Sequence, residues 1–302
     1  MKIAIIGAGI SGCNLYFNLK EKYDDITIFD KSRGTGGRLS TKYIGDKFID
    51  HGTPYLEPQS DELKDMCLYL SSQNILKARY DRFTPKNGAN KMCSFLIDKK
   101  DLVKQAKITK ASKTNSKWKL EDANCNVYEE FDMLFITIPT LQILEMEIDL
   151  NEDIRSSLAS VNYDSRFNVI LYSEDYIQLD EKLFEKNENI EKIINNSKKY
   201  GYQDFSSYVI HCSNEYSTKL NSHTKEEIFE MLKLSLGVKE NEQIKKFTAI
   251  PHLWKYAFAK STLDIPYYFD KETNLGICGD YFNLNNVEGS YLSSSMLADK
   301  FI

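Results

Sequence analysis

The pattern of apolar and polar positions divides the chain into segments typical of strands and helices. Residues 3–6 form an apolar run that stops at glycine, which predicts a buried strand. Residues 10–21 place apolar side chains at helical spacing, and residues 26–30 form a second strand-like run. Residues 132–138 are apolar on both faces, as in the central strand of a parallel sheet. This order predicts an α/β protein.

The middle of the chain adds shorter elements. Alternating positions between residues 106 and 128 predict a small antiparallel meander, and residues 167–172 and 207–212 predict two further strands. Residues 180–199 are rich in Lys, Glu and Asn, which favours a solvated helix and loop over a nucleic-acid surface.

Four helices have recognisable sequence signals. Ser60 precedes two acidic residues and helical apolar spacing, as an N-cap does, and residues 88–97 begin another helix. Thr224 and Glu227 form a capping box that leads an amphipathic helix. Residues 286–301 predict a final helix.

The first turn of the chain carries a dinucleotide-binding fingerprint. Gly7, Gly9 and Gly12 follow the first strand and open the first helix, in the Gly-x-Gly-x-x-Gly spacing. The glycines allow a tight turn, a close approach of a pyrophosphate, and close helix–strand packing. The helix N-terminus attracts phosphate, and Asp30, at the end of the second strand, is placed to accept hydrogen bonds from a ribose.

Two further stretches have the composition of a ligand site. Residues 33–38 hold three glycines and two arginines, which suit phosphate oxygens and a close backbone approach. Residues 275–280 predict a buried strand that ends in Gly279 and Asp280, at the edge where α/β sheets bind ligands.

The composition excludes several classes of protein. The 302 residues carry a formal net charge of −5, which argues against non-specific nucleic-acid binding. Six scattered cysteines form no Cys-x-x-Cys pair, so reduced thiols are expected and no metal site is predicted. No apolar run approaches the roughly 20 residues of a membrane helix. We expect a cytoplasmic protein of enzyme size that binds neither membrane nor nucleic acid.

Several motifs together resemble one protein family. They are the fingerprint, the Phe-Asp-Lys-Ser-Arg-Gly-x-Gly-Gly-Arg run at 29–38, Asp-His-Gly-Thr-Pro-Tyr at 50–55, Val-Ile-His at 209–211, His-x-Trp-x-Tyr-Ala at 252–257, and Cys-Gly-Asp with Val-Glu-Gly at 278–293. In this order the sequence resembles the flavin amine-oxidase superfamily, and within it the renalase-like FAD-dependent oxidoreductases.

The resemblance implies a two-domain fold, like that of amine oxidases and p-hydroxybenzoate hydroxylase. A Rossmann-like FAD-binding domain is expected over residues 1–57, 88–145 and 266–302. An inserted α+β substrate-binding domain is expected over residues 58–87 and 146–265.

The resemblance also implies non-covalent FAD. Asp30 would bind the adenosine ribose, Asp280 a ribityl hydroxyl, and the turn at Val287 would aim the last helix at the flavin. The residues expected at the cofactor are Gly7, Gly9, Ile10, Ser11, Gly12, Asp30, Lys31, Arg33, Gly36, Gly37, Arg38, His51, Gly52, Gly279, Asp280, Val287, Glu288 and Gly289.

The activity implied is oxidation of aberrant dihydro isomers of NAD(P), with hydride transfer to flavin N5 and reoxidation by O2 to give H2O2. The residues expected at this small-molecule substrate, as the catalytic set, are Tyr55, His252, Trp254 and Tyr256. The protein is expected to be a monomer or a weak dimer.

Some alternatives remain open from the sequence. Pro54 and Leu253 depart from the family pattern, and a missing arginine at 253 would weaken the dihydropyridine nucleotide assignment if that arginine contacts a substrate phosphate. The chain could instead be an amine oxidase, a desaturase-like enzyme, or an FAD-binding protein without turnover. The aromatic cluster around His252 could also be packed core.

Overall fold

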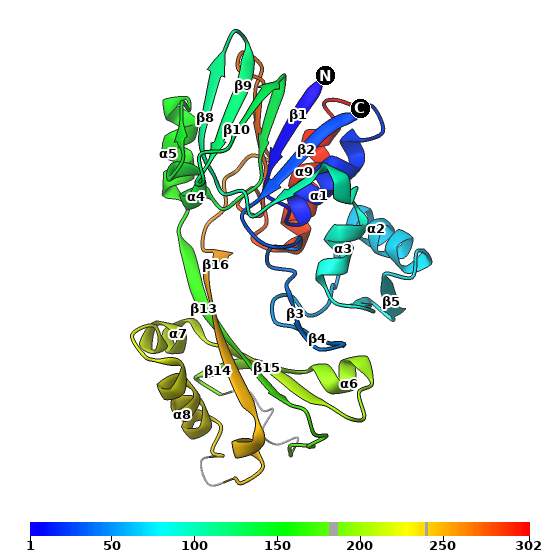
Figure 1. The fold of residues 1–302 in the computed structure, drawn as a ribbon, viewed down its shortest axis with the longest axis vertical. Coiled ribbons are helices and arrows are strands. Elements are labelled where there is room, and N and C mark those ends of the chain that lie inside the picture. Colours follow the sequence, from blue (N-terminus) through cyan, green and yellow to red (C-terminus); the bar gives the residue numbers. More distant parts are fainter. Residues whose placement is uncertain (181–186, 239–240) are drawn as a thin grey trace. The chain divides into compact units, whose positions relative to one another are not determined.

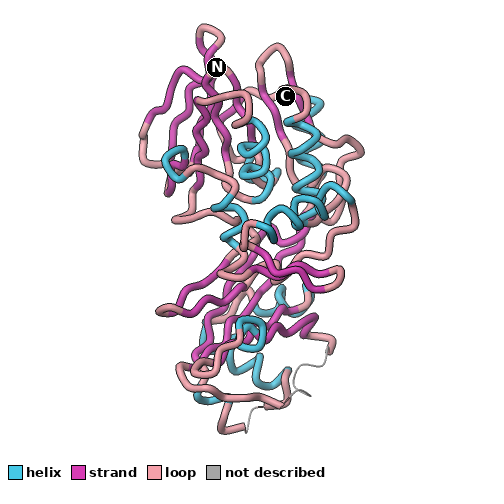
Figure 2. The backbone as a smooth tube through the Cα atoms, turned by 90° about the vertical axis from the view of Figure 1, so that its right-hand side faces the viewer, coloured by secondary structure: helices cyan, strands magenta, loops and turns pink. Residues whose placement is uncertain are grey.

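The computed structural model describes residues 1–180, 187–238 and 241–302. Within it the chain forms two compact units, each assembled from separate segments. The first unit comprises Met1–Leu39, Tyr55–Asn162 and Ala259–Ile302, and the second comprises Ser40–Pro54 and Tyr163–Phe258. Figure 2 shows helices and strands in both units, as the predicted α/β and α+β classes require.

The first unit is built on a six-stranded sheet in the order β17-β18-β11-β1-β2-β7. Five of these strands are parallel and β17 is antiparallel to β18. The apolar run at 132–138 lies next to β1, inside the sheet, as predicted. The strands are β1 (Lys2–Ile6), β2 (Asp25–Asp30), β7 (Leu102–Lys104), β11 (Met133–Ile136), β17 (Tyr268–Asp270) and β18 (Leu275–Ile277).

Two helices from opposite ends of the chain pack side by side in this unit, α1 (Ile10–Leu19) and α9 (Val287–Ala298) (Figure 1). The Ser11 hydroxyl donates to the Ser290 carbonyl at 3.1 Å, and Asn14 Nδ2 donates to Ser294 Oγ at 2.9 Å. Because both contacts advance along the two helices in the same direction, the helices are parallel. Their N-termini therefore lie at the same end.

The rest of the first unit surrounds this sheet. A second sheet in the order β10-β9-β8-β12 contains the predicted antiparallel meander. Its strands are β8 (Ile108–Thr114), β9 (Lys117–Asp122), β10 (Val127–Phe131) and β12 (Glu147–Ile148). The remaining elements are α2 (Asp61–Ser72), β5 (Leu76–Arg79), β6 (Arg82–Pro85), α3 (Asn90–Phe95), the 3-10 helix η1 (Lys99–Asp101), α4 (Thr140–Leu144) and α5 (Glu152–Ser160).

The second unit contains a four-stranded sheet in the order β14-β15-β13-β16 and a hairpin of β3 and β4. Its strands are β3 (Thr41–Ile44), β4 (Lys47–Asp50), β13 (Tyr163–Ser173), β14 (Ile190–Asn195), β15 (Ser206–Cys212) and β16 (Thr248–Ala259). Its helices are α6 (Asn196–Tyr200), α7 (Asn214–Leu220), α8 (Lys225–Ser235) and the 3-10 helix η3 (Ile244–Lys246). Helix α8 begins with the predicted capping box.

The two faces of this sheet differ in what covers them. On one face, side chains such as Val169 and Ile210 form a core with α7 and α8. On the other, Ile170 and Val209 pack against Ile49 of β4. We call the second face the hairpin face. Since side chains alternate along a strand, the polar residues in register with Ile170 and Val209 also belong to it.

The predicted domain boundaries are corrected in several places. Residues 58–87 belong to the first unit, because Leu63 and Leu70 of α2 share the apolar core of β1 and α1. Residues 40–54 belong to the second unit, because Ile49 packs on its sheet. Residues 146–162 and 259–265 also belong to the first unit.

The prediction of a solvated helix and loop at 180–199 is wrong for part of this stretch, and residues 181–186 lie outside the described part of the chain. Strand β14 occupies Ile190–Asn195 and pairs with β15. Strand β14 lies at the edge of the sheet and exposes Glu191 and Lys192. Because of these polar residues, its sequence lacks the apolar pattern from which a strand would be predicted. In the described residues, no helix is long and apolar enough to cross a membrane.

Candidate functional site

The glycines of the fingerprint have separable roles in the turn between β1 and α1. Gly7 has a φ of +108°, which side chains rarely adopt. A Cβ atom at Gly12 would lie 1.9 Å from the Gly7 carbonyl oxygen. At Gly9 a Cβ would meet no atom within 4 Å. The protein itself therefore requires glycine at 7 and 12, whereas the space beside Gly9 is open to a ligand.

Asp30 connects this turn to the loop that follows β2. Its carboxylate accepts from the Ala8 N–H and from the Ser32 N–H, both at 2.7 Å. A carboxylate has about four acceptor positions, so these two bonds leave capacity for ribose hydroxyls. The expected contact with ribose is compatible with this geometry.

The Gly-rich loop at 33–38 lies directly against the fingerprint turn. The Gly36 N–H donates to the Ala8 carbonyl at 2.8 Å, and Gly9 and Gly36 form an isolated parallel bridge. A Cβ at Gly37 would lie 3.3 Å from the Gly9 Cα. Lys31 and Arg33 at the start of the loop are exposed to solvent.

Arg38 and Asp280, 242 residues apart, form a bidentate ion pair with both N–O distances 2.6 Å. Asp280 is buried and follows β18, and the Gly279 N–H donates to Ser293 Oγ of α9 at 3.2 Å. The pair joins the Gly-rich loop to the segment that follows β18. The sequence predicted that both segments contact the same ligand. The two carboxylate oxygens of Asp280 are already used by Arg38, so a ribityl hydroxyl would share them.

The N-terminus of α9 is built by a local cap. Asn286 Oδ1 accepts from the Gly289 N–H at 2.8 Å, and a Cβ at Gly289 would lie 1.8 Å from the Leu284 carbonyl oxygen. Val287 packs against the core. The Glu288 side chain is buried and accepts from the Gln59 N–H at 3.1 Å and from the Ser60 N–H. Glu288 therefore positions the start of α2, and its side chain is committed within the protein.

These features fit a dinucleotide. Ile10, Ser11 and Gly12 form the first turn of α1, whose N-cap Gly9 provides no side-chain hydrogen bond and whose first turn has no acidic residue. Its N–H groups and positive dipole end thus suit a pyrophosphate, whereas the first turn of the parallel α9 contains the acidic Glu288, which offsets its positive end. The α1 terminus stabilises a nearby negative charge by about 0.3–1 kcal/mol.

A separate cluster of rings lies in the second unit, on the hairpin face. The His51 ring lies 4.9 Å from that of His252 and stacks on that of Trp254 at 5.5 Å. His252 and Trp254 contact each other at 4.4 Å. The two residues of β16 share a face because they are two positions apart, and His51 follows β4. The structure therefore brings together three residues that the sequence predicted separately.

The polar atoms of this ring cluster are only partly satisfied. His51 Nε2 lies 3.0 Å from Ser40 Oγ, and the His51 carbonyl accepts from Asn168 Nδ2 at 2.7 Å. His51 Nδ1 and Trp254 Nε1 are buried and have no partner among the described residues. A buried polar atom without a hydrogen bond costs free energy, so each marks a place for an external partner.

The histidines of the ring cluster are uncharged at neutral pH. Burial and, to a smaller extent, the neighbouring His252 lower the pKa of His51 to about 3, although Asp50 opposes the shift. Burial also lowers the pKa of His252. Neutral imidazoles can donate or accept a hydrogen bond but do not attract an anion by charge.

The other predicted substrate residues contact different side chains. Tyr256, further along β16, contacts the Tyr163 ring edge-on at 5.5 Å. Tyr55 belongs to the first unit, where the Arg82 guanidinium lies over its ring at 4.0 Å. Gly52 is buried beside His51 in the second unit, so these two expected cofactor residues are not in the unit that carries the fingerprint.

Sequence reasoning missed the buried ion pair that holds the segment around His51. Asp50 is 0% exposed and accepts from Lys199 Nζ at 2.5 Å, from Thr41 Oγ1 at 2.7 Å, and from the Tyr200 hydroxyl. Lys199 Nζ also donates to the Pro54 carbonyl. Burial lowers the pKa of Lys199, and Asp50 opposes that shift. An Asp preceding His51 was visible in the motif, but its partner in α6 was not.

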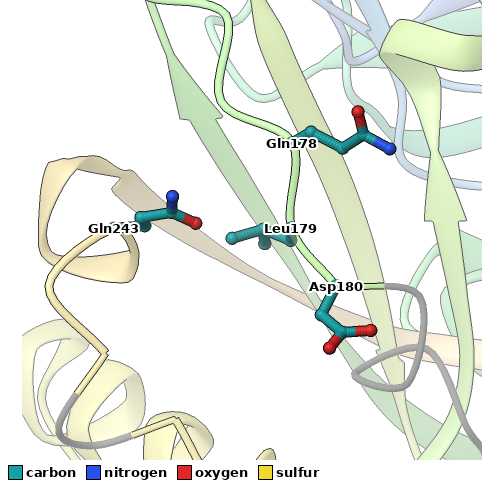
Figure 3. A pocket seen from close by; sticks show the side chains of 4 residues that line it. All are labelled: Gln178, Leu179, Asp180 and Gln243. Carbon is teal, nitrogen blue, oxygen red and sulfur yellow. The ribbon is translucent and has the colours of Figure 1, made fainter.

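A surface hollow elsewhere in the second unit is lined by Gln178, Leu179, Asp180 and Gln243 (Figure 3). None of these residues was predicted at the site, and none belongs to the ring cluster. The hollow therefore contributes nothing to the candidate site.

Comparison with known proteins agrees with the expected resemblance. Residues 5–70 match the family model described as NAD(P)-binding Rossmann-like domain. Renalase of Mus musculus is 23% identical over 204 residues, a match that covers 57% of this chain and 58% of the mouse protein. The chain therefore matches little more than half the length of this curated relative.

Solved structures share the fold over the whole chain. Putrescine oxidase bound to putrescine has a TM-score of 0.69 at 11% identity, and cyclohexylamine oxidase from Brevibacterium oxydans has 0.69 at 10% identity. Each alignment covers 99% of this chain and 98% of the other. The solved structures thus confirm the two-domain α/β fold class, and the similarity to mouse renalase supports the expected resemblance to renalase-like oxidoreductases.

Proposed function

We propose that the chain is an FAD-dependent oxidase of the renalase type, which oxidises a small reduced heteroaromatic ring such as an aberrant dihydro isomer of NAD(P). The chemistry that FAD supplies when bound is hydride acceptance at N5 and reoxidation by O2 to H2O2. The chain supplies binding and orientation. The residues proposed to hold the cofactor are Gly9, Ile10, Ser11, Asp30, Arg38, Gly279 and Asp280.

Support for FAD over NAD comes from the contacts that join the fingerprint turn to the C-terminal segments. An NAD site needs the fingerprint turn and Asp30, but it does not need binding residues from the other end of the chain. In this chain the Arg38–Asp280 pair and the contact of Ser11 with Ser290 join the fingerprint to the C-terminal segments. A long cofactor whose central pyrophosphate carries the negative charge fits this arrangement, with the pyrophosphate at the N-terminus of α1.

The observation that carries the substrate assignment is the ring cluster of His51, His252 and Trp254, with its two unpartnered buried nitrogens. Flat rings favour a flat ligand, since offset aromatic pairs contribute about 0.5–1.5 kcal/mol beyond their burial. The carboxylate that acts on His51 is Asp50, and it is ion-paired with Lys199. The cluster thus suits an uncharged ring better than a protonated amine.

No strong base is needed in this reaction, because a dihydropyridine is already a hydride donor. The neutral imidazoles and the indole N–H would orient the ring by hydrogen bonds. Orientation matters because hydride transfer requires the reacting atoms within about 3–3.5 Å.

The test is anaerobic mixing of the yellow, FAD-loaded protein with partly reduced NAD isomers. Ordinary NADH and simple amines serve as controls. We expect rapid bleaching of the flavin with the isomers alone, followed by H2O2 formation when O2 is admitted. A colourless protein that takes up no FAD refutes the cofactor assignment. A yellow protein that no donor bleaches would be an FAD-binding protein without turnover.

Matched variants locate the two parts of the site. Asp30→Ala should weaken FAD retention without changing which donor bleaches the flavin that remains. Trp254→Phe keeps a ring but removes the buried N–H, and should slow bleaching roughly tenfold, as expected for one lost hydrogen bond to a buried group. His223→Gln, at an exposed position, is the control that should change neither.

A flavin amine oxidase is the second candidate. Putrescine oxidase and cyclohexylamine oxidase share the fold, and aromatic rings can hold a cation through their π faces. Bleaching by amines alone would establish this function in place of the first. A desaturase-like reaction would require bleaching by a saturated apolar substrate.

A further inference from the structure

The hairpin face carries two more unpartnered buried nitrogens beyond the ring cluster. His211 of β15 lies in register with Asn168 of β13, the residue whose amide holds the His51 carbonyl. His211 Nε2 is buried and has no partner among the described residues, and the same holds for Arg166 Nε. Arg166 is two positions from Asn168, so it shares the face. Neither residue has a role in the site described so far.

Several other polar groups of this region have partners inside the protein. The buried carboxylate of Asp50 has Lys199, and Ser197 Oγ accepts from the Ser207 N–H at 2.6 Å. Asn168 donates to His51. Unpaired nitrogens are therefore not a general feature of this face. They gather on His51, Trp254, His211 and Arg166, where an outside partner would satisfy them.

The charges around His211 define what that partner can be. Arg166 lies 2.8 Å from Glu191 and 3.5 Å from Asp164, so its positive charge is balanced by two carboxylates. Burial, together with the positive charges of Lys192 and Arg166, lowers the pKa of His211 to about 4. The neutral imidazole of His211 and the ion-paired guanidinium of Arg166 therefore attract neither an anion nor a cation strongly. Arg166 Nε–H can only donate, so the partner must offer an acceptor oxygen.

We propose that His211 and Arg166 form a polar subsite next to the ring cluster, and that it binds an uncharged carbonyl or hydroxyl group carried by the substrate ring. The proposal rests on the proposed function, since it concerns the same ligand. His211 and Arg166 are specificity residues in it: they select the substituent, while the ring cluster holds the ring.

The test is calorimetric titration of the FAD-loaded protein with two ring probes that cannot be oxidised by hydride loss. The probes are 3-acetylpyridine and 3-isopropenylpyridine, which have similar shapes and differ in that a CH2 group replaces the carbonyl oxygen. We expect the acetyl probe to bind about tenfold more tightly. His211→Leu should reduce this preference to about twofold, and His211→Gln should retain most of it. Arg166→Lys, which keeps the charge but moves the donor, should also reduce the preference.

Lys192→Met is the matched control. Lys192 lies opposite His211 on β14, so its removal changes the local field without removing a hydrogen-bonding group of the subsite. The preference should survive it. Equal binding of both probes by the unaltered protein would overturn the proposal. The proposal would also be overturned if His211→Leu weakened the binding of both probes equally. The same holds if Lys192→Met reduced the preference for the acetyl probe as much as His211→Leu does.

This outcome is independent of the anaerobic bleaching experiment. A protein that prefers the acetyl probe but is not bleached by dihydro isomers retains the subsite and loses the proposed oxidase activity. A protein that is bleached but shows no preference retains the activity and loses the subsite. Thermal unfolding of each variant identifies one that fails to fold, in which case His211→Gln and Arg166→Lys decide.

Discussion

The candidate sites of the two units consist of different kinds of chemical group. In the first unit the site consists of glycines, helix termini and backbone N–H groups, completed by the Arg38–Asp280 pair. In the second unit it consists of side chains, among them His51, His252 and Trp254, whose nitrogens are buried and in part unpartnered. A site made of backbone groups in one turn is specified by the local sequence. A site made of side chains from distant strands forms only when those strands pack together.

The two sites also differ in charge. The first unit presents the N-terminus of α1 without an acidic residue in its first turn, which suits a negatively charged ligand. The second unit keeps His51 and His252 neutral by burial and pairs its buried Asp50 with Lys199. We therefore propose that the first site binds a charged ligand and that the second orients an uncharged one. The following changes test this division.

The largest effect is expected at the buried ion pair of the second unit. Lys199→Met leaves the fully buried Asp50 without its cation, and breaking such a pair costs about 3–5 kcal/mol. Urea unfolding should register this loss. In the double variant Asp50→Asn, Lys199→Met, most of the loss should be recovered. If the single variant is as stable as the unaltered protein, the pair does not hold the segment around His51.

The next prediction compares Gly12, where the fold requires glycine, with Gly9, where only ligand binding requires it. Gly12→Ala would place a methyl group 1.9 Å from the Gly7 oxygen, and should cost roughly 3 kcal/mol in unfolding free energy. Gly9→Ala meets no protein atom within 4 Å, so the apoprotein should unfold at an unchanged temperature. Its FAD affinity should nevertheless fall about 100-fold, or ~2.7 kcal/mol, because the methyl occupies the space of the pyrophosphate.

Equilibrium dialysis measures the FAD affinity, and calorimetric scans of the apoprotein measure stability. An unstable Gly9→Ala apoprotein would contradict the assignment of the open space to a ligand.

A smaller effect is expected from the acid sensitivity of the ring cluster. The unfolded chain protonates His51 near pH 6.5, whereas the folded protein resists protonation until about pH 3. The unfolded state thus binds more protons in this window, so stability is complete above pH 6.5 and is lost as the pH falls toward 3.

His51→Gln should remove this loss. Between pH 6.5 and 5 the unaltered protein should lose about 2 kcal/mol more unfolding free energy than the variant. Unfolding curves at each pH measure the difference. His223→Gln, which removes an exposed histidine, should leave the pH dependence unchanged, and parallel curves for His51→Gln would refute a neutral buried His51.

The smallest effect is expected from a local cap remote from both sites. Thr224→Ala removes the capping box of α8 and should cost about 1 kcal/mol. FAD affinity and probe selectivity should not change, since no site residue contacts this cap. A change in either would mean that the sites depend on the general stability of the second unit.

The sequence predicted the elements better than their grouping. The amphipathic helix α2 was correctly predicted to begin after Ser60. Its apolar positions do not indicate which of the two cores it packs against. In the structure it packs in the core of β1 and α1. The hairpin at 40–54 was assigned by its neighbours in sequence, although Ile49 packs on the second unit. Strand β14 was missed because an edge strand needs only one apolar face.

The sequence by itself determined the fingerprint turn, because spacing of glycines, the following helix and the terminal acid act within thirty residues of one another. It did not predict β16, and only within that observed strand does the alternation of side chains place His252 and Trp254 on one face. Only the tertiary structure decided that His51 stacks on Trp254, that Lys199 neutralises Asp50, and that His211 lies in register with Asn168. These contacts join residues more than forty positions apart, and pairing of that kind depends on the register of packed strands rather than on any local pattern.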